Sequence, residues 1–161
     1  MLNAIRLFAF LAGIFSLAPA QAGQVNRLNN VYYEDIFAGA SCPGTNRCNV
    51  VSSPTPSDGY LSISHVYCSV TTRAQLQLMY FQVWTAPPSS GGSVIRSVFL
   101  GFSPITANAA NGFYYYNFDQ NVFFFVGQNR YVVLSGQTIP GDTQGVSLSC
   151  SITGTMVPPP A

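Results

Sequence analysis

The sequence predicts an all-β fold, an antiparallel β-sandwich or jelly-roll-like domain of about eight strands that is stapled by disulfides. Three observations lead to this prediction. Apolar and polar residues alternate with a period of two in several short segments. Clusters of Gly, Pro, Ser and Asn separate these segments. No segment between them repeats apolar residues with a helical period, which argues against a parallel α/β fold.

Turn-forming residues set the bounds of the predicted strands. The breaks at 41–59, 87–92 and 136–145 are rich in Gly, Pro and Ser, and residues 127–129 suit a three-residue hairpin connection. The polar start of the domain is expected to be flexible, and the loop after the fourth strand is expected to hold one helical turn. The predicted strands are 31–38, 60–71, 75–84, 94–102, 113–118, 121–126, 130–134 and 146–153.

The first 22 residues have the anatomy of a secretory signal peptide. Arg6 is the only charge in this segment, an apolar run covers residues 7–17, and Ala-Gln-Ala at 20–22 supplies a small-x-small cleavage pattern. Cleavage is expected after Ala22, with cleavage after Ala20 as the alternative. The protein is therefore predicted to be secreted or periplasmic.

Beyond the signal, the sequence predicts one domain at 23–157 and a Pro-rich tail at 158–161. The whole chain has six arginines, no lysine and five acidic residues, so charged residues make up only 7% of it. This composition argues against a nucleic-acid binder, which needs a basic surface to displace counterions. The longest apolar run after the signal, residues 122–126, is too short for a transmembrane helix.

All four cysteines follow the signal: Cys42, Cys48, Cys68 and Cys150. An even number in an exported chain predicts two disulfides, for which three pairings exist. Cys68 and Cys150 each lie on the apolar face of an alternating strand, so we expect them to pair. Cys42 and Cys48 bracket a Pro-Gly turn and are expected to pair with each other. A redox pair or metal site is the weaker alternative, because the chain has no C-x-x-C motif and one histidine.

No motif in the sequence predicts catalysis. His65 is the only histidine, no G-x-S-x-G elbow is present, and nothing in the sequence ties an acid to this histidine. The five acids lie near turns, which favours turn-forming and rim charges over a catalytic pair. Asn117, Asp119 and Asn121 alternate and could face one calcium ion, but one carboxylate supplies little charge. We therefore expect no cofactor and no metal, and a hydrolase with a loop-built site is the least favoured alternative.

Aromatic side chains give the best indication of function. Trp84 ends a predicted strand close to a Pro-Pro break. In the run 114–116, Tyr114 and Tyr116 share one face and Tyr115 takes the other, with Asn117 next along the chain. Flat rings with amide neighbours suit stacking on sugars or burial in a protein interface, although packing in the core and its rim is the more ordinary role of such rings. The predicted ligand-binding residues are Trp84, Tyr114, Tyr116 and Asn117.

The sequence thus favours an exported, non-catalytic module that binds a protein or a glycan through aromatic strand faces and loops. The alternative is a self-assembling structural subunit of a cell-surface layer or fibre. The segment 121–134 is strongly β-prone and carries a single charge. An open strand edge there would add strands from a second copy, and a homo-oligomer is the expectation of this alternative.

Overall fold

The computed structural model describes residues 23–29, 31–101 and 112–158, which form ten strands in two antiparallel sheets. The predicted signal peptide, the predicted helical turn at 107–110 and the last three residues of the tail lie outside the described residues. In chain order the elements are β1 (Gln24–Leu28), β2 (Tyr32–Ile36), β3 (Ala40–Cys42), β4 (Arg47–Val51), β5 (Tyr60–Thr72), β6 (Leu76–Trp84), the short 3-10 helix η1 (Pro88–Ser90), β7 (Val94–Phe99), β8 (Tyr114–Val126), β9 (Tyr131–Thr138) and β10 (Val146–Val157).

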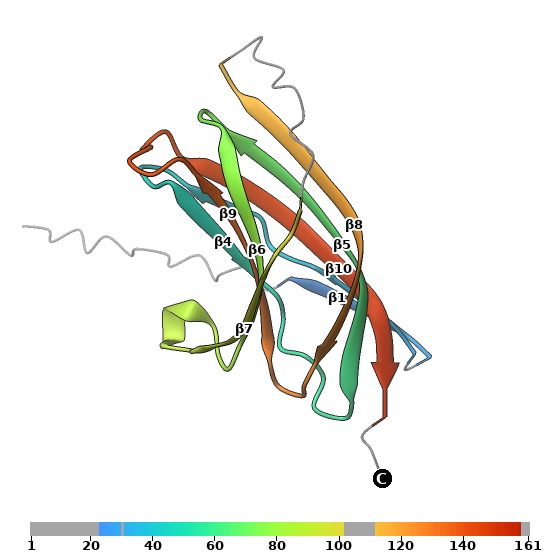
Figure 1. Cartoon of the computed structure of the whole chain (residues 1–161). Helices are drawn as coiled ribbons and strands as arrows, with labels where there is room; N and C mark the ends of the chain where they lie inside the picture. The colour runs from blue at the N-terminus through green and yellow to red at the C-terminus, as the bar shows by residue number, and fades with distance from the viewer. Residues whose placement is uncertain (1–22, 30, 102–111, 159–161) are drawn as a thin grey trace, which may run out of the picture.

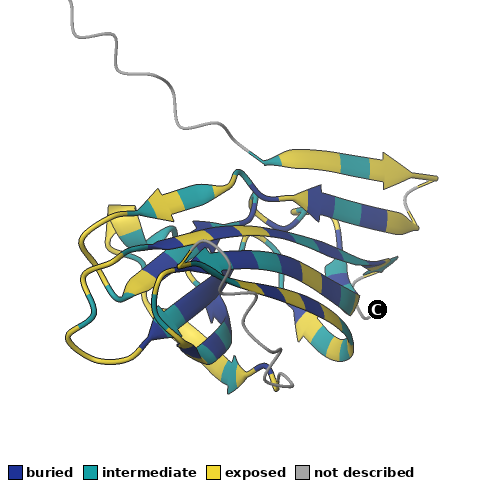
Figure 2. Cartoon of the chain, turned by 90° about the horizontal axis from the view of Figure 1, so that it is seen from above, coloured by how far each residue is buried: buried dark blue, intermediate teal, exposed yellow. Residues whose placement is uncertain are grey.

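The two sheets pack face to face as a sandwich (Figure 1). Sheet A has the order β1-β2-β10-β5-β8, and sheet B has the order β4-β9-β6-β7. The short strand β3 also pairs with β10, before β2 takes over the same edge further along the strand. Buried and exposed bands alternate along most strands, as Figure 2 shows. The predicted antiparallel β-sandwich is confirmed.

The core fills the space between the inner faces of the two sheets. Phe81 of sheet B stacks on Phe124 of sheet A, with ring centroids 4.4 Å apart. A bulge in β5 between Ile63 and His65 shifts its register against β8, so the buried face changes from odd to even positions there. The fully buried members of β5 are Leu61, Ile63, Val66, Cys68 and Val70.

Both predicted disulfides are confirmed. Cys68 and Cys150 lie directly opposite each other on β5 and β10, with Cα atoms 4.1 Å apart and both side chains buried. Cys42 ends β3 in sheet A and Cys48 lies in β4 of sheet B, so this bond joins the two layers. The first bond therefore fixes a register inside one sheet, and the second fixes one sheet to the other.

Several element bounds differ from the sequence predictions. The polar start, expected to be flexible, forms β1 because its backbone pairs with β2 as an edge strand. The expected loop 41–59 contains the end of β3 and all of β4, which pair with β10 and β9 despite their shortness. The two predicted strands 113–118 and 121–126 are one strand, β8, because β5 pairs with both segments in spite of its bulge. The described residues hold no helix long and apolar enough to cross a membrane.

We predict that the loss of Cys68–Cys150 destabilises the protein more than the loss of Cys42–Cys48. The paired residues are 82 and 6 positions apart, so the chain-entropy model gives losses of about 4–5 and about 2–3 kcal/mol. Equilibrium urea unfolding of C68A/C150A and C42A/C48A measures both losses. Equal losses, or a larger loss for the short loop, would contradict this ranking.

Candidate functional site

The outer face of sheet A is lined with hydroxyl groups. Along β10, Val146, Leu148, Cys150 and Ile152 point into the core, so the intervening residues point outward. Ser147 and Ser149 then lie opposite Thr71 and Ser69 of β5, and Ser41 of β3 lies opposite Ser147 on the other side. We call this set the hydroxyl patch: Ser41, Ser69, Thr71, Ser147 and Ser149.

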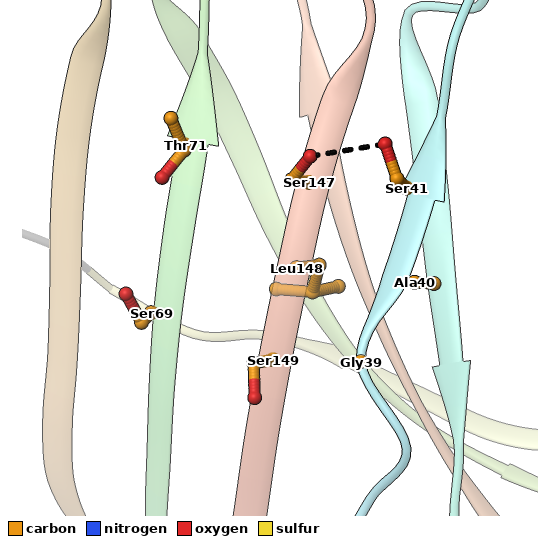
Figure 3. Close-up of a pocket in the computed structure, with 8 residues that line it drawn as sticks. All are labelled: Gly39, Ala40, Ser41, Ser69, Thr71, Ser147, Leu148 and Ser149. Carbon is orange, nitrogen blue, oxygen red and sulfur yellow. Dashed lines mark hydrogen bonds between the residues drawn. The ribbon is translucent and has the colours of Figure 1, made fainter. Parts of the chain in front are cut away.

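The hydroxyl patch lines a shallow, open groove of about 360 Å³, shown in Figure 3. The Ser147 hydroxyl donates to the Ser41 hydroxyl at 3.2 Å. The groove continues into a second hollow that shares Ser41, Thr71 and Ser147 and is closed by Arg73 and Phe113. Together the two hollows form a trough across β3, β10 and β5, in which the hydroxyl groups lie beside the apolar surface of Ala40 and Leu148.

Aromatic rings border the trough on the side of β8 and β5. Tyr115 lies opposite Thr71 and is 48% exposed. Tyr67 lies on β5, two residues before Ser69, and is 42% exposed. The Phe113 ring centroid lies 6.4 Å from that of Tyr115, and the Arg73 guanidinium sits 4.7 Å above Phe113. The rim therefore offers flat apolar surfaces and one cation next to the hydroxyl groups.

His65 lies further along the same outer face, with an acid beside it. Its Nε2 atom is 3.2 Å from Asp119 Oδ1, and its Nδ1 atom is 3.2 Å from Asn121 Oδ1. This contact could not be predicted from the sequence, because it depends on the pairing of β5 with β8. Asp119 and Asn121 thus contact the imidazole. The described residues contain no group of three or more His, Cys, Asp or Glu that could hold a metal.

The structure does not bring the four predicted ligand-binding residues together. Tyr116 points into the core and is only 3% exposed, and its hydroxyl accepts the Leu76 N–H at 3.0 Å. Tyr114 is half-buried and stacks on Tyr116, with centroids 6.4 Å apart. The exposed tyrosine of this run is Tyr115, because Tyr116 lies opposite the inward-facing Val70 of β5 and this pairing fixes which face is buried. Asn117 does lie on the outer face of sheet A, opposite Ser69 of the hydroxyl patch.

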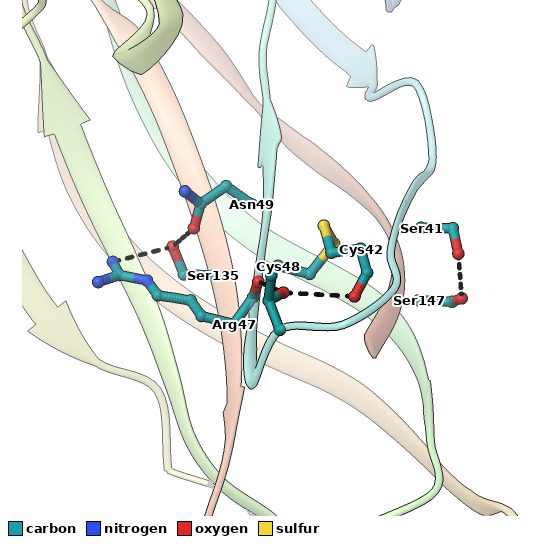
Figure 4. The surroundings of a disulfide bond; sticks show 8 residues. Ser41, Cys42, Arg47, Cys48, Asn49, Ser135 and Ser147 are labelled. Carbon is teal, nitrogen blue, oxygen red and sulfur yellow. Dashed lines mark hydrogen bonds between the residues drawn. A yellow bond between two sulfur atoms is a disulfide. The ribbon is translucent and has the colours of Figure 1, made fainter. Parts of the chain in front are cut away.

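Trp84 belongs to a polar network on the opposite side of the molecule, the outer face of sheet B. Its Nε1–H donates to Gln82 Oε1 at 3.2 Å, and Gln82 Nε2 donates to Ser97 Oγ at 3.3 Å. Arg47 Nη2 donates to Gln82 Oε1 and to Ser135 Oγ, both at 3.4 Å, as Figure 4 shows for Ser135. Gln82 and Ser135 are buried although they point away from the core, so this network holds side chains to one another.

The acids divide between surface and core. Asp58 pairs with Arg27 at 3.1 Å on the surface, and the hydrogen bond from Arg27 lowers the pKa of Asp58. Asp142 accepts the Gln144 N–H at 2.9 Å in a turn, as expected. The prediction that the acids form turns or lie at the rim is wrong for Asp35, which is fully buried between the sheets. Burial raises the pKa of Asp35 to about 6.

Comparison with models of known families and with curated protein sequences found no match. Solved structures with a similar chain course include the K3 cleaved adhesin domain of Lys-gingipain from Porphyromonas gingivalis, at 9% identity and TM-score 0.40, covering 73% of each chain. Dimeric latent PorU from the same organism has 12% identity and TM-score 0.42, and the match covers 86% of this chain but 14% of PorU. A carbohydrate-binding module specific for non-crystalline cellulose has 14% identity and TM-score 0.33, covering 84% of this chain and 78% of the module. At these scores the likeness carries no argument about function.

We predict that Gln82→Ala destabilises the fold, because it removes the group that Trp84, Arg47 and Ser97 share. The buried polar partners would lose hydrogen bonds, and the free energy of unfolding should fall by about 1–3 kcal/mol. Gln77→Ala, on an exposed position of the same strand, is the matched control and should change stability by less than about 0.5 kcal/mol. Urea unfolding followed by Trp84 fluorescence measures both, and equal effects would argue against a stabilising network.

Proposed function

We propose that this chain is an exported, non-catalytic binding module whose ligand is a neutral glycan. The observation that carries the proposal is the hydroxyl patch in its trough, bordered by the exposed rings of Tyr67 and Tyr115. Asn117 adds an amide between these rings, opposite Ser69. The outer face of sheet A is the proposed glycan-binding face.

The chemistry of this face suits a neutral sugar ligand. Hydroxyl and amide groups donate and accept hydrogen bonds without charge, as sugar hydroxyls do. Neighbouring strands lie about 4.8 Å apart, so a ligand lying across β3, β10 and β5 meets a hydroxyl on each strand. Tyrosine rings then offer flat apolar surfaces for stacking against the ligand.

Two observations support an exported, non-enzymatic role. Both disulfides are formed, and such bonds persist in oxidising compartments outside the cytosol. His65 and Asp119 are adjacent, but the second ring nitrogen of His65 faces the Asn121 amide rather than a serine hydroxyl. A serine hydrolase places its nucleophile at that nitrogen, so the arrangement favours binding over hydrolysis.

We predict that Tyr67→Ala and Tyr115→Ala each weaken glycan binding by about tenfold or more, because each removes a stacking platform. Affinity electrophoresis in gels containing neutral polysaccharides, followed by calorimetry with the best ligand, measures the effect. Trp84→Ala is the matched control on the outer face of sheet B and should bind as the unaltered protein does. The proposal fails if no glycan binds, or if the Tyr67 and Tyr115 variants keep full affinity.

A second candidate function, self-assembly, is favoured by the apolar end of β8. Phe123 is 73% exposed and Phe125 is 49% exposed, and their rings meet edge to face with centroids 5.2 Å apart. Among the described residues β8 pairs with one strand, β5, and a strand from a second copy would add on the side of β8 away from β5. This end of the face would then be covered in an assembly.

Self-assembly predicts an oligomer that depends on these rings. Light scattering coupled to size-exclusion chromatography should show association at high protein concentration, and Phe123→Ser should shift the equilibrium towards monomer because it removes exposed apolar area. Ile139→Ser, at another exposed apolar position, is the control and should leave association unchanged. A monomer at every concentration and pH would exclude this function.

A further inference from the structure

The buried carboxylate of Asp35 is only half satisfied. Its Oδ2 atom accepts the Ser53 N–H at 2.8 Å and the Tyr33 hydroxyl at 3.3 Å. Its Oδ1 atom is buried and has no hydrogen-bond partner among the described residues. A buried polar atom without a partner is costly, so a native protein normally supplies one.

Among the described residues, the side chains around Asp35 supply no cation. Val25 of β1 and Ile152 of β10 lie opposite it. Burial first, and then the charge of Asp35, raise the pKa of Tyr33, so this phenol is a neutral donor. The nearest arginine in sequence, Arg27, contacts Asp58 at the surface. Glu34 accepts from Asn26 at 3.0 Å on the other face of β2.

The backbone of Gly23 lies against the unpaired oxygen. A Cβ atom on residue 23 would lie 2.8 Å from Asp35 Oδ1 and 2.7 Å from the Ile36 carbonyl oxygen. No side chain fits there, so glycine allows this close approach. The backbone nitrogen of Gly23 is bonded to the Cα atom that would carry this Cβ. Gly23 is also the residue that follows the predicted cleavage site.

We propose that removal of the signal peptide creates a site in which the new α-ammonium group of Gly23 pairs with the buried carboxylate of Asp35. Hydrolysis adds one water across the Ala22–Gly23 peptide bond. Ala22 takes the oxygen as a carboxylate, and the Gly23 nitrogen becomes an amine that binds a proton at neutral pH. An amide with one N–H and no charge thus becomes a cation with three donors. This inference rests on the predicted signal peptide and is independent of the proposed glycan binding.

Pairing changes how stability depends on pH. In a chain whose Gly23 nitrogen is still an amide, the pKa of Asp35 rises on folding from 3.8 to about 6. The folded state then binds the proton more tightly, so stability is lost as pH rises from about 4 to about 6, by roughly a hundredfold in the unfolding constant. A cation beside the carboxylate lowers its folded pKa, so the processed chain should lose little stability over this range. Tyr33 stays neutral over this range, because its pKa is raised.

The test compares two chains that differ by one residue. One begins at Gly23, the other begins at Ala22, and each is made with Asp35 and as D35N. With Asp35 present, the additional Ala22 should raise the unfolding constant at pH 7 about tenfold or more, and the loss should shrink below pH 4. In the D35N pair the additional Ala22 should change the unfolding constant by less than about twofold. An equal effect in both pairs would overturn the proposal.

A second measurement does not depend on whether D35N folds. The pKa of the Gly23 amine, from NMR of chain labelled with 15N-glycine, should lie above that of an ordinary α-amino group in the folded chain and return to normal in urea. Glu34→Gln is the matched control, because it removes a charge from the same strand on its other face. It should leave the raised amine pKa in place. An ordinary amine pKa in the folded chain would exclude the ion pair.

Discussion

The pairing of β5 with β10 is the constraint on which the rest of the structure depends. These two strands pair along their length with one register shift, between Thr153 and Gly154, and Cys68–Cys150 joins them at one fixed pair of residues. The other edge of β10 pairs with β3 and β2, and the other edge of β5 pairs with β8. Because side chains alternate along β10, the same register sends Leu148 and Cys150 into the core and Ser147 and Ser149 to the trough.

Local alternation explains why some of this was predictable from the sequence. Residues 146–153 show one purely apolar and one purely polar face, so both the strand and the inward direction of Cys150 could be read directly. In β8 both faces carry aromatic rings, and only the pairing of Tyr116 with Val70 decides which side is buried. The contact of His65 with Asp119 depends on that same pairing, which alternation within one strand does not reveal. The burial of Asp35 could have been predicted, because in an extended strand it lies on the same face as Tyr33 and Phe37, both of which are buried.

The polar groups of the two outer faces differ in what they contact. On sheet B, Gln82 and Ser135 are buried by their neighbours and their hydrogen bonds end on Arg47, Ser97 and Trp84. On sheet A, the serines of the trough lie in an open groove that faces solvent. A set of polar groups that satisfies itself stabilises a fold, whereas one that faces water can exchange that water for a ligand. This contrast supports the proposal that sheet A carries the glycan-binding face, whereas Trp84 lies in the hydrogen-bonded network of sheet B.

β10 is the last of the described strands, and its pairings bear on how the protein reaches its native state. β10 pairs with β2, β3 and β5, and the β5 partner of Cys150 lies 82 residues earlier. Sheet A is therefore complete only when β10 has been synthesised and has paired with strands that are far away in the sequence. Long-range strand pairing of this kind folds slowly, in milliseconds to seconds rather than microseconds. Until then β2, β3 and β5 lack the partner that β10 supplies, which makes this interval the time of greatest risk of aggregation.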